Sequence, residues 1–506
     1  MNWNLYHRLL ASAAHEQSIC METESGNQLT YAELAAISGR FAAYLSDCGV
    51  GPGHRVAAKI EKSIEAIALY LATLRCGAVY LPLNIAYTAS ETEYFIQDAK
   101  PTLVVCDPGQ KADVAAICAR SGGKVRTLDA SGTGSLVQDA APFPDAFCTV
   151  RRGKDDLAAI LYTSGTTGRS KGAMLTHGNL VSNALTLVDE WCYSREDVLV
   201  HALPINHIHG LFVACNVTLA ARGRIMLMSK FDVEHVLTAL KRATVLMGVP
   251  TFYIRLLQSS NLDQAAVAGM RLFVSGSAPL LAETHREWKS RTGHEILERY
   301  GMTETGMITS NPYDGPRIGG SVGQPLLGVE VRVSDPETGA LLPAGEVGMI
   351  EVKGPNVFAG YWKMPEKTKA EFRPDGFFKT GDLGKLDEHG YLQIVGRGKD
   401  LIISGGLNIY PKEVEAEIDQ IPGVSESAVV GAPHADFGEA VTAAVVRKPG
   451  ASVDEHAIVE ALSGRLAKFK QPKRIVFVEA LPRNAMGKVQ KNVLRERFVD
   501  LFALKM

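Results

Sequence analysis

Short apolar segments alternate with helical patterns along the first 300 residues, and this alternation constrains the fold more than any other feature. Apolar runs at 55–60, 78–81 and 103–106 indicate buried strands, with a helical pattern at 63–75 between the first two. Similar runs return at 198–203, 245–249 and 272–275. Strand-length runs separated by helices are typical of parallel βαβ units. We therefore predict an α/β fold of mixed sheets flanked by helices.

The pattern changes beyond Gly328. Segments 329–333, 348–352 and 391–395 alternate apolar and polar residues between turn sequences, which predicts antiparallel strands in a β-barrel-like portion. After 396–400 the pattern becomes α+β, with a helix near 411–421, strands at 427–430 and 442–446, and a helix from 453. Ser452 and Glu455 form a capping box for that last helix.

A domain boundary is placed at Lys399–Asp400. It divides the chain into a large N-terminal domain, 1–398, and a small α+β C-terminal domain, 399–506. The second piece is long enough to fold as a small domain.

Composition excludes several classes of protein. The 506 residues carry a formal net charge of -2, so no global basic field favours nucleic acid as a partner. The eight cysteines include no C-x-x-C pair, which favours a reducing cytoplasm. The longest apolar stretch, 64–83, contains Glu65 and Arg75, so we predict no membrane span. Residues 1–17 lack the apolar core of a signal peptide.

The strongest chemical signal is a loop rich in glycine and hydroxyl groups behind an apolar strand at 157–161. Residues 162–172 read YTSGTTGRSKG. Glycines let backbone N–H groups turn toward a ligand, hydroxyls donate hydrogen bonds and Lys171 adds charge, as a polyphosphate site requires. The spacing is not that of a Walker A loop, because Ser170 occupies its second glycine position. A flexible linker is the alternative, which the preceding buried strand disfavours.

This loop resembles the signature loop of the adenylate-forming superfamily, which contains acyl-CoA synthetases, nonribosomal peptide adenylation domains and firefly-type luciferases. Further motifs of that superfamily follow in order: LPINHIHG at 203–210, YGMTET at 300–305, TGDLG at 380–384, GRGKD at 396–400 and PRNAMGK at 482–488. The resemblance implies that the chain binds ATP, Mg²⁺ and coenzyme A. It also implies that a carboxylic acid is first adenylated and then transferred to the CoA thiol.

The resemblance also assigns an ATP site. A carboxylate beside a triphosphate is repulsive unless a cation lies between them, so Glu304 implies Mg²⁺. Asp382 can accept hydrogen bonds from both ribose hydroxyls, and Arg397 can donate to them. Taken alone, these could be a surface glutamate and a turn aspartate. The full set of expected ATP-binding residues is Thr163, Ser164, Gly165, Thr166, Thr167, Gly168, Lys171, Ser277, Ala278, Pro279, Tyr300, Gly301, Thr303, Asp382 and Arg397.

Four residues are expected to be catalytic: Lys488, Glu304, Thr163 and Lys171. By resemblance, Lys488 reaches the α-phosphate and the reacting carboxylate, where a positive charge stabilises the transition state. The alternative for Lys488 is one of many solvated lysines. The corresponding lysine is acetylated in related synthetases, so a lysine acetyltransferase and a deacetylase are candidate partners.

The resemblance further implies that the C-terminal domain turns between two half-reactions. Lys399 matches the hinge position. Gly405, Gly406 and Leu407 match the loop that lines the pantetheine tunnel of coenzyme A after the turn. These assignments predict a mobile cap that carries both the catalytic lysine and the CoA-side loop.

The acid pocket is expected where segments 204–210, 248–256 and 275–280 meet. Over nearly its whole length the chain is similar to malonyl-CoA synthetases, in which an arginine matching Arg255 and a serine matching Ser277 bind the distal carboxylate. A guanidinium group binds a carboxylate through two parallel hydrogen bonds, which suits a dicarboxylic acid.

Local patterns add three expectations about this pocket. Phe252 and Arg255 are spaced i, i+3 and would share one helical face. His207 lies where related enzymes place an aromatic gate, and Arg286 is a second candidate for the distal carboxylate. A surface arginine on an amphipathic helix is the local alternative for Arg255.

The expected function is therefore ATP-dependent ligation of malonate to coenzyme A. A ligase for another small, medium-chain or aryl acid is the nearest alternative. An adenylating module that loads a carrier protein, or a non-catalytic nucleotide-binding regulator, would be of a different class. The regulator is disfavoured because Lys171, Glu304, Asp382 and Lys488 are all present.

Overall fold

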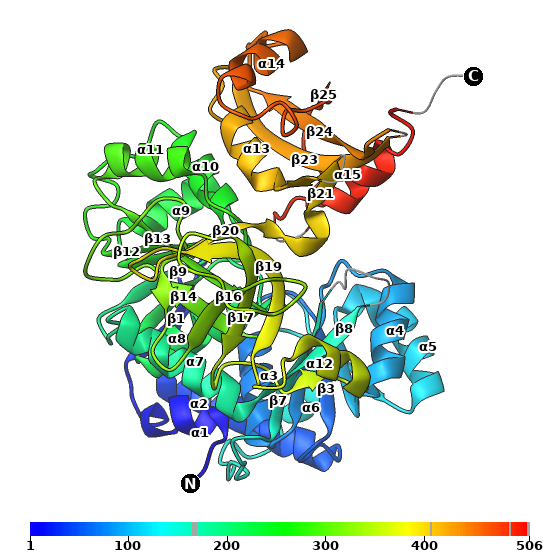
Figure 1. Ribbon diagram of the computed structural model, residues 1–506. Coiled ribbons are helices and arrows are strands. Elements are labelled where there is room, and N and C mark those ends of the chain that lie inside the picture. The colour runs from blue at the N-terminus through cyan, green and yellow to red at the C-terminus, as the bar shows by residue number, and fades with distance from the viewer. Residues whose placement is uncertain (164–169, 405–406, 435, 485–486, 503–506) are drawn as a thin grey trace.

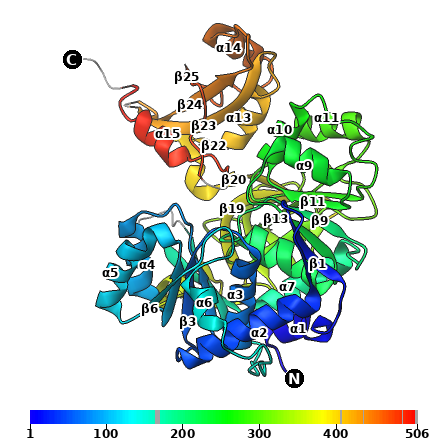
Figure 2. The same cartoon turned by 180° about the vertical axis from the view of Figure 1, so that it is seen from behind.

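The computed structural model describes residues 1–163, 170–404, 407–434, 436–484 and 487–502 (Figure 1). A large body contains three sheets with helices packed around them. A smaller body, formed by the last hundred or so residues, lies against one end of it (Figures 1 and 2). The predicted α/β fold class is confirmed.

The largest sheet contains nine strands, and its central strands are parallel. The carboxyl ends of β9, β11, β12 and β13 therefore lie along one edge, where sites in such sheets form. The strands in spatial order are β15 (Gln324–Pro325), β14 (Gly306–Ser310), β13 (Ile296–Met302), β12 (Leu272–Ser275), β11 (Val245–Gly248), β9 (Val198–His201), β10 (Arg224–Leu227), β1 (Ile19–Thr23) and β2 (Gln28–Thr30).

The second sheet contains seven strands and includes the strand before the glycine-rich loop. Its five consecutive strands from β7 to β6 are parallel, whereas β8 runs antiparallel to β7. The strands in spatial order are β18 (Gly360–Tyr361), β8 (Lys171–Thr176), β7 (Leu157–Thr163), β4 (Val79–Pro82), β3 (Arg55–Lys59), β5 (Leu103–Cys106) and β6 (Lys124–Thr127).

Helices cover both sheets, and α3 is buried along nearly its whole length. Ser63 caps α3 by accepting a hydrogen bond from the Ala66 N–H at 3.1 Å. No helix among the described residues has both the length and the apolar character needed to cross a bilayer. The helices of the large body are α1 (Leu5–Leu9), α2 (Tyr31–Asp47), α3 (Ile64–Arg75), α4 (Ala89–Ala99), α5 (Lys111–Ser121), α6 (Ser135–Ala140), α7 (His177–Glu190), α8 (Asn216–Ala220), α9 (Val233–Leu240), α10 (Pro250–Leu257), α11 (Ala282–Thr292) and α12 (Pro365–Glu371).

The predicted antiparallel portion is confirmed as a four-stranded sheet. Its order is β16 (Glu330–Ser334), β17 (Gly348–Lys353), β19 (Phe378–Leu386) and β20 (Leu392–Arg397). The barrel-like description needs correction, because β16 and β20 are opposite edges of an open sheet and do not pair with each other. Four strands of this length bury their inner face against neighbouring elements without closing.

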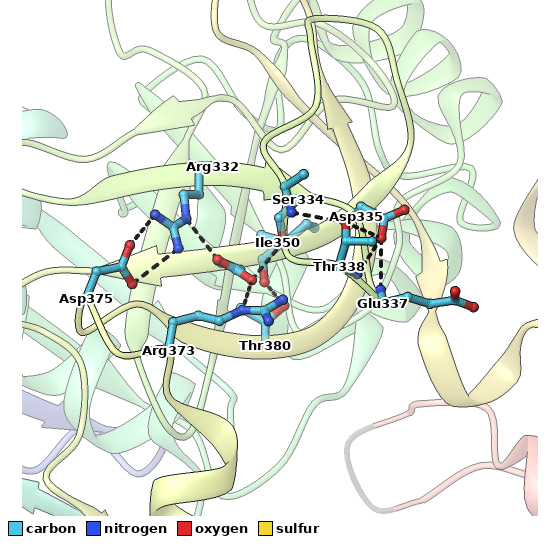
Figure 3. A network of polar contacts seen from close by, with 11 residues as sticks. Arg332, Ser334, Asp335, Glu337, Thr338, Ile350, Arg373, Asp375 and Thr380 are labelled. Atoms are coloured by element: carbon cyan, nitrogen blue, oxygen red, sulfur yellow. Dashed lines mark hydrogen bonds and ion pairs between the residues drawn. The ribbon is translucent and has the colours of Figure 1, made fainter.

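A buried carboxylate organises the outer strands of this sheet. Glu351 accepts hydrogen bonds from Arg332 at 2.8 Å, from Arg373 at 2.6 Å and from the Ser334 hydroxyl at 2.7 Å. Figure 3 shows these partners, with Asp375 on the far side of Arg332. Burial alone would raise the pKa of Glu351, but the hydrogen bonds from Ser334, Arg373 and Arg332 outweigh it and the pKa is lowered.

We expect Glu351→Gln to lower the free energy of unfolding by about 3–5 kcal/mol, the usual cost of removing one partner of a buried ion pair. Because the folded-state pKa of Glu351 is depressed, its contribution is present at neutral pH and is lost as the pH falls through the folded pKa. Urea unfolding of the wild-type protein and of Glu351→Gln at pH 7 and pH 4 measures the difference in the free energy of unfolding. A loss for Glu351→Gln that was equally large at both pH values would contradict the ion-pair explanation.

The C-terminal body contains a five-stranded sheet with three helices. Its two apolar clusters contain only residues that follow position 401. Its elements are β21 (Ile402–Ser404), β22 (Leu407–Ile409), α13 (Pro411–Ile418), β23 (Val424–His434), β24 (Gly438–Arg447), α14 (Glu455–Ser463), β25 (Arg474–Phe477) and α15 (Lys491–Arg497).

The predicted capping box of α14 is wrong by two residues. Asp454 is the N-cap and accepts a hydrogen bond from the Ala457 N–H at 2.8 Å. Glu455 instead accepts from the Ile475 N–H at 3.0 Å and so ties α14 to β25. Aspartate and serine are equally good caps, so local sequence could not choose between Asp454 and Ser452.

Candidate active site

The glycine-rich loop connects two paired antiparallel strands. Thr163 ends β7 and faces Lys171, the first residue of β8, and the Thr163 hydroxyl lies 3.4 Å from the Lys171 carbonyl oxygen. Tyr94 on α4 donates to the Ser170 carbonyl at 2.8 Å, which anchors the loop exit. Five of the predicted phosphate-binding residues lie outside the described residues: Ser164, Gly165, Thr166, Thr167 and Gly168.

A buried carboxylate lies next to the end of this loop. Tyr361 donates to Glu304 Oε1 at 3.0 Å, and Lys171 Nζ lies 4.7 Å from the centre of the Tyr361 ring. Burial raises the pKa of Glu304, while Tyr361 and the nearby cations oppose the shift. The half-buried Thr303 precedes it. Glu304 and Lys171 are thus brought together, with Thr303 adjacent, as the sequence predicts.

The donor set around Glu304 fits a divalent cation shared with a polyphosphate. Carboxylate oxygen is a preferred Mg²⁺ ligand, and such ions keep only one or two protein carboxylates in nucleotide sites. Among the described residues, no group of three or more histidine, cysteine or acidic side chains could enclose a metal ion alone. Glu304 would therefore be one protein ligand, with phosphate oxygens and water supplying the others.

Three more predicted ATP ligands form one cluster. Asp382 on β19 faces Arg397 on β20, and the Asp382 Oδ1–Arg397 Nε distance is 3.1 Å. Tyr300, on β13, donates to Asp382 Oδ2 at 2.6 Å. Two sheets thus contribute to a buried carboxylate that suits the two hydroxyls of a ribose. Gly301 allows close strand packing here, since a Cβ would lie 2.1 Å from the Gly306 carbonyl oxygen.

The segment after β12 is strained at one residue. Ser277 has φ = 70°, a left-handed conformation that is uncommon for serine. Such strain concentrates where the backbone must present a group to a ligand. Ser277 and Ala278 are half-buried, and Pro279 is exposed.

The three segments expected to line the acid pocket do adjoin. The Ser277 hydroxyl lies 3.2 Å from Nδ1 of His209, and the Gly276 N–H donates to the Gly248 carbonyl at 3.3 Å. His207 is half-buried in the same segment as His209. Burial first, then Arg299 and Lys488, lowers the pKa of His207 to about 4, so its ring is neutral at physiological pH.

A buried arginine lies against one of these three segments. Arg299 is only 2% exposed, and its Nε and Nη2 atoms have no hydrogen-bond partner among the described residues. Its guanidinium group packs on Gly276, where a Cβ would lie 2.5 Å from Arg299 Cζ. Burial lowers the pKa of Arg299 to about 9, which still leaves it protonated at neutral pH. A buried, charged and unpaired guanidinium group is costly unless a ligand pairs with it.

The signal for Arg299 was present in the sequence. It stands in the run ILERYGM, in the middle of a buried strand, where charged residues are rare. Burial at a strand position is decided by neighbouring elements, so the run alone did not give the direction of the side chain.

Arg255 and Arg286 lie differently from expectation. Phe252 is buried and stacks on Phe231 with ring centres 4.0 Å apart, whereas Arg255 is exposed. The predicted shared face is therefore wrong for this structure. Three residues place Arg255 about 60° around the helix from Phe252, on the side away from the buried Tyr253, Leu256 and Leu257. Arg286 is exposed on α11. A role for either in acid binding stays a prediction.

Lys488 lies where the C-terminal body meets these clusters. Burial and, to a smaller extent, Arg397 lower its pKa, Asp382 opposes them, and the net pKa is about 8. The same lysine contributes to the lowered pKa of His207. Lys488 is thus an electrostatic neighbour of both the ribose cluster and the acid pocket, as adenylation requires.

The predicted hinge and CoA-side residues lie nearby but are not tested by these contacts. Lys399 is exposed in a short 3₁₀ turn, where Arg495 of α15 pairs with Asp400 at 2.5 Å. Leu407 is exposed at the start of β22. Gly405 and Gly406 lie outside the described residues.

Comparison with known proteins identifies the class of this site. The AMP-binding enzyme family matches residues 10–362, and the AMP-binding enzyme C-terminal domain matches residues 413–488. The chain belongs to the AMP-binding enzyme family.

Particular relatives narrow the comparison. A malonate–CoA ligase of Arabidopsis thaliana is 37% identical over 88% of this chain and 78% of its own length. The crystal structure of ATP-bound MatB from Rhodopseudomonas palustris is 62% identical, covers 99% of this chain and 100% of that one, and superimposes with a TM-score of 0.98. The apo form of MatB, with the same identity and coverage, gives a TM-score of 0.87. The present arrangement is therefore closer to the ATP-bound form.

Proposed function

We propose that this protein is an ATP-dependent malonate–CoA ligase. The observation that carries the proposal is the buried, unpaired guanidinium group of Arg299 beside Ser277 and His209, in the acid pocket of an AMP-binding enzyme. A dicarboxylic acid offers one carboxylate for adenylation and a second to pair with Arg299. The identity of the chain to a malonate–CoA ligase and to MatB supports the same acid.

The first half-reaction is adenylation. A carboxylate oxygen of malonate attacks the α-phosphorus of ATP, the bond to the bridging oxygen breaks, and pyrophosphate leaves with the bonding electrons. Lys488 would bind the oxygens on which negative charge builds up, and Asp382 and Arg397 would hold the ribose. Arg299 would hold the distal carboxylate, so that only the other one reaches phosphorus.

The second half-reaction forms the thioester. The CoA thiolate attacks the carbonyl carbon of malonyl-AMP, and AMP leaves. We propose that the domain of residues 399–506 turns about Lys399 between the two steps and brings Gly405, Gly406 and Leu407 toward the thiol. The close match to an ATP-bound relative supports assigning the present arrangement to adenylation.

Mg²⁺ would be held by Glu304 and would neutralise phosphate charge when bound. Tyr361 orients the Glu304 carboxylate and Lys171 lies above the Tyr361 ring, so Tyr361 holds the two charged groups near each other. Thr163 and Thr303 would donate hydrogen bonds to phosphate oxygens.

A monocarboxylic acid fits this pocket less well. It would leave Arg299 unpaired and forgo a charged hydrogen bond worth about 1.5–3 kcal/mol. Sites built to pair a polar group reject analogues that lack it far better than apolar pockets discriminate size. Aryl and medium-chain acids are disfavoured for the same reason.

The test is pyrophosphate release with acetate, propionate, malonate, methylmalonate, succinate, octanoate and benzoate, each with and without CoA. We expect kcat/KM for malonate to exceed that for acetate or propionate at least about tenfold, as one charged hydrogen bond requires. CoA should stimulate turnover. Faster turnover of a monocarboxylic acid would refute malonate as substrate, and turnover that ignored CoA would point to a carrier protein as acceptor.

A further inference from the structure

A lysine buried near the acid pocket has no acidic partner in the contacts that the described residues make with it. Lys62 lies between β3 and α3 and is 8% exposed. A positive charge next to a helix N-terminus is unfavourable, and a buried charge without an ion pair is costly. Burial lowers the pKa of Lys62 to about 7. The hydrogen bonds that Lys62 makes must offset the cost of burying its amino group.

Lys62 holds the end of β9 and the start of the acid-binding segment. Its Nζ donates to the carbonyl oxygens of His201 at 3.1 Å and Leu203 at 2.8 Å, and lies 3.4 Å from Nδ1 of His201. Nε2 of His201 lies 2.8 Å from the carbonyl oxygen of Gly210, which can only accept, so the ring proton is on Nε2. Nδ1 is then the acceptor that faces Lys62.

Lys62 and His201 therefore fix both ends of residues 203–210. The second end begins a π-helix, His209–Cys215, a form that is rare and frequent at functional sites. The segment is closed tightly, since a Cβ on Gly210 would lie 2.1 Å from the Pro204 carbonyl oxygen. His207 and His209 lie between the two fixed points.

The two residues also join the two large sheets. Lys62 follows β3 of the seven-stranded sheet, and His201 ends β9 of the nine-stranded sheet. The acid-binding segment starts at this junction. His209 of this segment contacts Ser277, and the backbone at the start of the segment is held by Lys62, which follows a strand of the seven-stranded sheet.

We propose that Lys62 and His201 are positioning residues that determine acid specificity. They fix residues 203–210 so that this wall of the pocket cannot retreat from the acid, and they do so without touching it. The inference rests on the proposed function, because it assigns a selective role to the same pocket. A pocket wall that is held at both ends can admit a short dicarboxylic acid and reject an acid that is one methyl group larger.

The test compares Lys62→Met with Lys59→Met. Lys59 ends the same strand, is also buried, and donates to the Tyr87 carbonyl at 2.6 Å instead of to the acid segment. A small displacement of a positioning group can cost about 10²-fold in rate. For Lys62→Met we expect kcat/KM for malonate to fall about 10- to 100-fold, KM for ATP to stay within about twofold, and the preference for malonate over methylmalonate and succinate to shrink.

The control and the His201 variants decide the outcome. Lys59→Met should lower the melting temperature with wild-type malonate preference. His201→Leu should reproduce Lys62→Met, and the double variant should be no worse than either single one, because residues that act as one unit are not additive. His201→Leu, which cannot donate to Gly210, also serves as the second variant if Lys62→Met does not fold, whereas His201→Gln keeps a donor for Gly210 and should retain most of the preference.

Three results would overturn the proposal: an unchanged acid preference in Lys62→Met, an unchanged preference in His201→Leu, or additive losses in the double variant. The wild-type acid panel separates this from failure of the proposed function. If the wild-type protein prefers another acid, malonate is refuted as the substrate, and the same comparison is made with the preferred acid. If the wild-type protein prefers malonate and the variants retain that preference, only the proposed role of Lys62 and His201 is refuted.

Discussion

Lys488→Met removes adenylation activity almost completely, with an expected loss of about 10²–10³-fold in malonate-dependent pyrophosphate exchange. The reason is electrostatic: a placed cation that stabilises charge developing in the transition state is worth about 2.7–4 kcal/mol. Thioester formation from supplied malonyl-AMP and CoA should fall far less, because pyrophosphate has already left. Equal losses in both half-reactions would contradict the assignment of Lys488 to the first.

The pH dependence of adenylation offers a second readout of the same residue. The lowered pKa of Lys488, about 8, means that its positive charge is present below that pH and is lost above it. Because kcat/KM reports ionisations of the free enzyme, kcat/KM for ATP should decline as the pH rises through about 8. This decline at alkaline pH should be absent in Lys488→Met. An inflection near 10 in wild type would show that the lysine is solvated in the free enzyme. Acetylation of Lys488 stays a prediction and would mimic the loss of charge.

Arg299→Leu should lower kcat/KM for malonate by about 10²-fold or more, while propionate turnover changes little. The variant leaves the distal carboxylate buried without its charged partner, which typically costs about 2–5 kcal/mol. KM for ATP should stay near the wild-type value. Initial rates with malonate and propionate at saturating ATP measure the switch. An equal fall for both acids would indicate general damage to β13 and not loss of carboxylate recognition.

Two further variants sharpen this result. Arg255→Ala removes the exposed arginine that resemblance singles out: a normal malonate KM assigns the distal carboxylate to Arg299 alone, and a loss comparable to that of Arg299→Leu assigns it to both. Gly276→Ala keeps every charged group but displaces the Arg299 guanidinium group, since the new Cβ would lie 2.5 Å from its Cζ. It should reproduce much of the Arg299→Leu effect if the position of the charge matters.

Site residues that belong to short motifs could be predicted from the sequence. The motif around Asp382, the GR pair containing Arg397 and the strand before residues 162–172 could each be read locally, and the structure brings Asp382, Arg397 and Tyr300 into contact. Strand positions were also predictable: the runs at 272–275 and 103–106 are strands with those same bounds. Apolar periodicity and turn residues act over a few neighbours, so no tertiary information was needed.

The direction and burial of individual side chains could not be predicted from the sequence. Arg255 and Arg299 are both arginines near the pocket segments, and only packing against Gly276 and the surrounding strands buries the second. The role of Glu455, which accepts from the Ile475 N–H instead of closing a capping box, is likewise a contact between distant segments. The open edges of the four-stranded sheet depend on how its strands pair.

By itself, the sequence determined the α/β class, the AMP-binding family and the residue types that an adenylating site needs, because these depend on periodicity and on motifs of adjacent residues. Only the tertiary structure decided that Arg299 is buried with no hydrogen-bond partner for its Nε and Nη2 atoms among the described residues, and that Lys62 of one sheet fixes the acid-binding segment that starts from the other. The Lys62 contacts join residues more than 100 positions apart and form only when the two sheets pack together, whereas the burial of Arg299 depends on Gly276 beside the neighbouring strand of its own sheet.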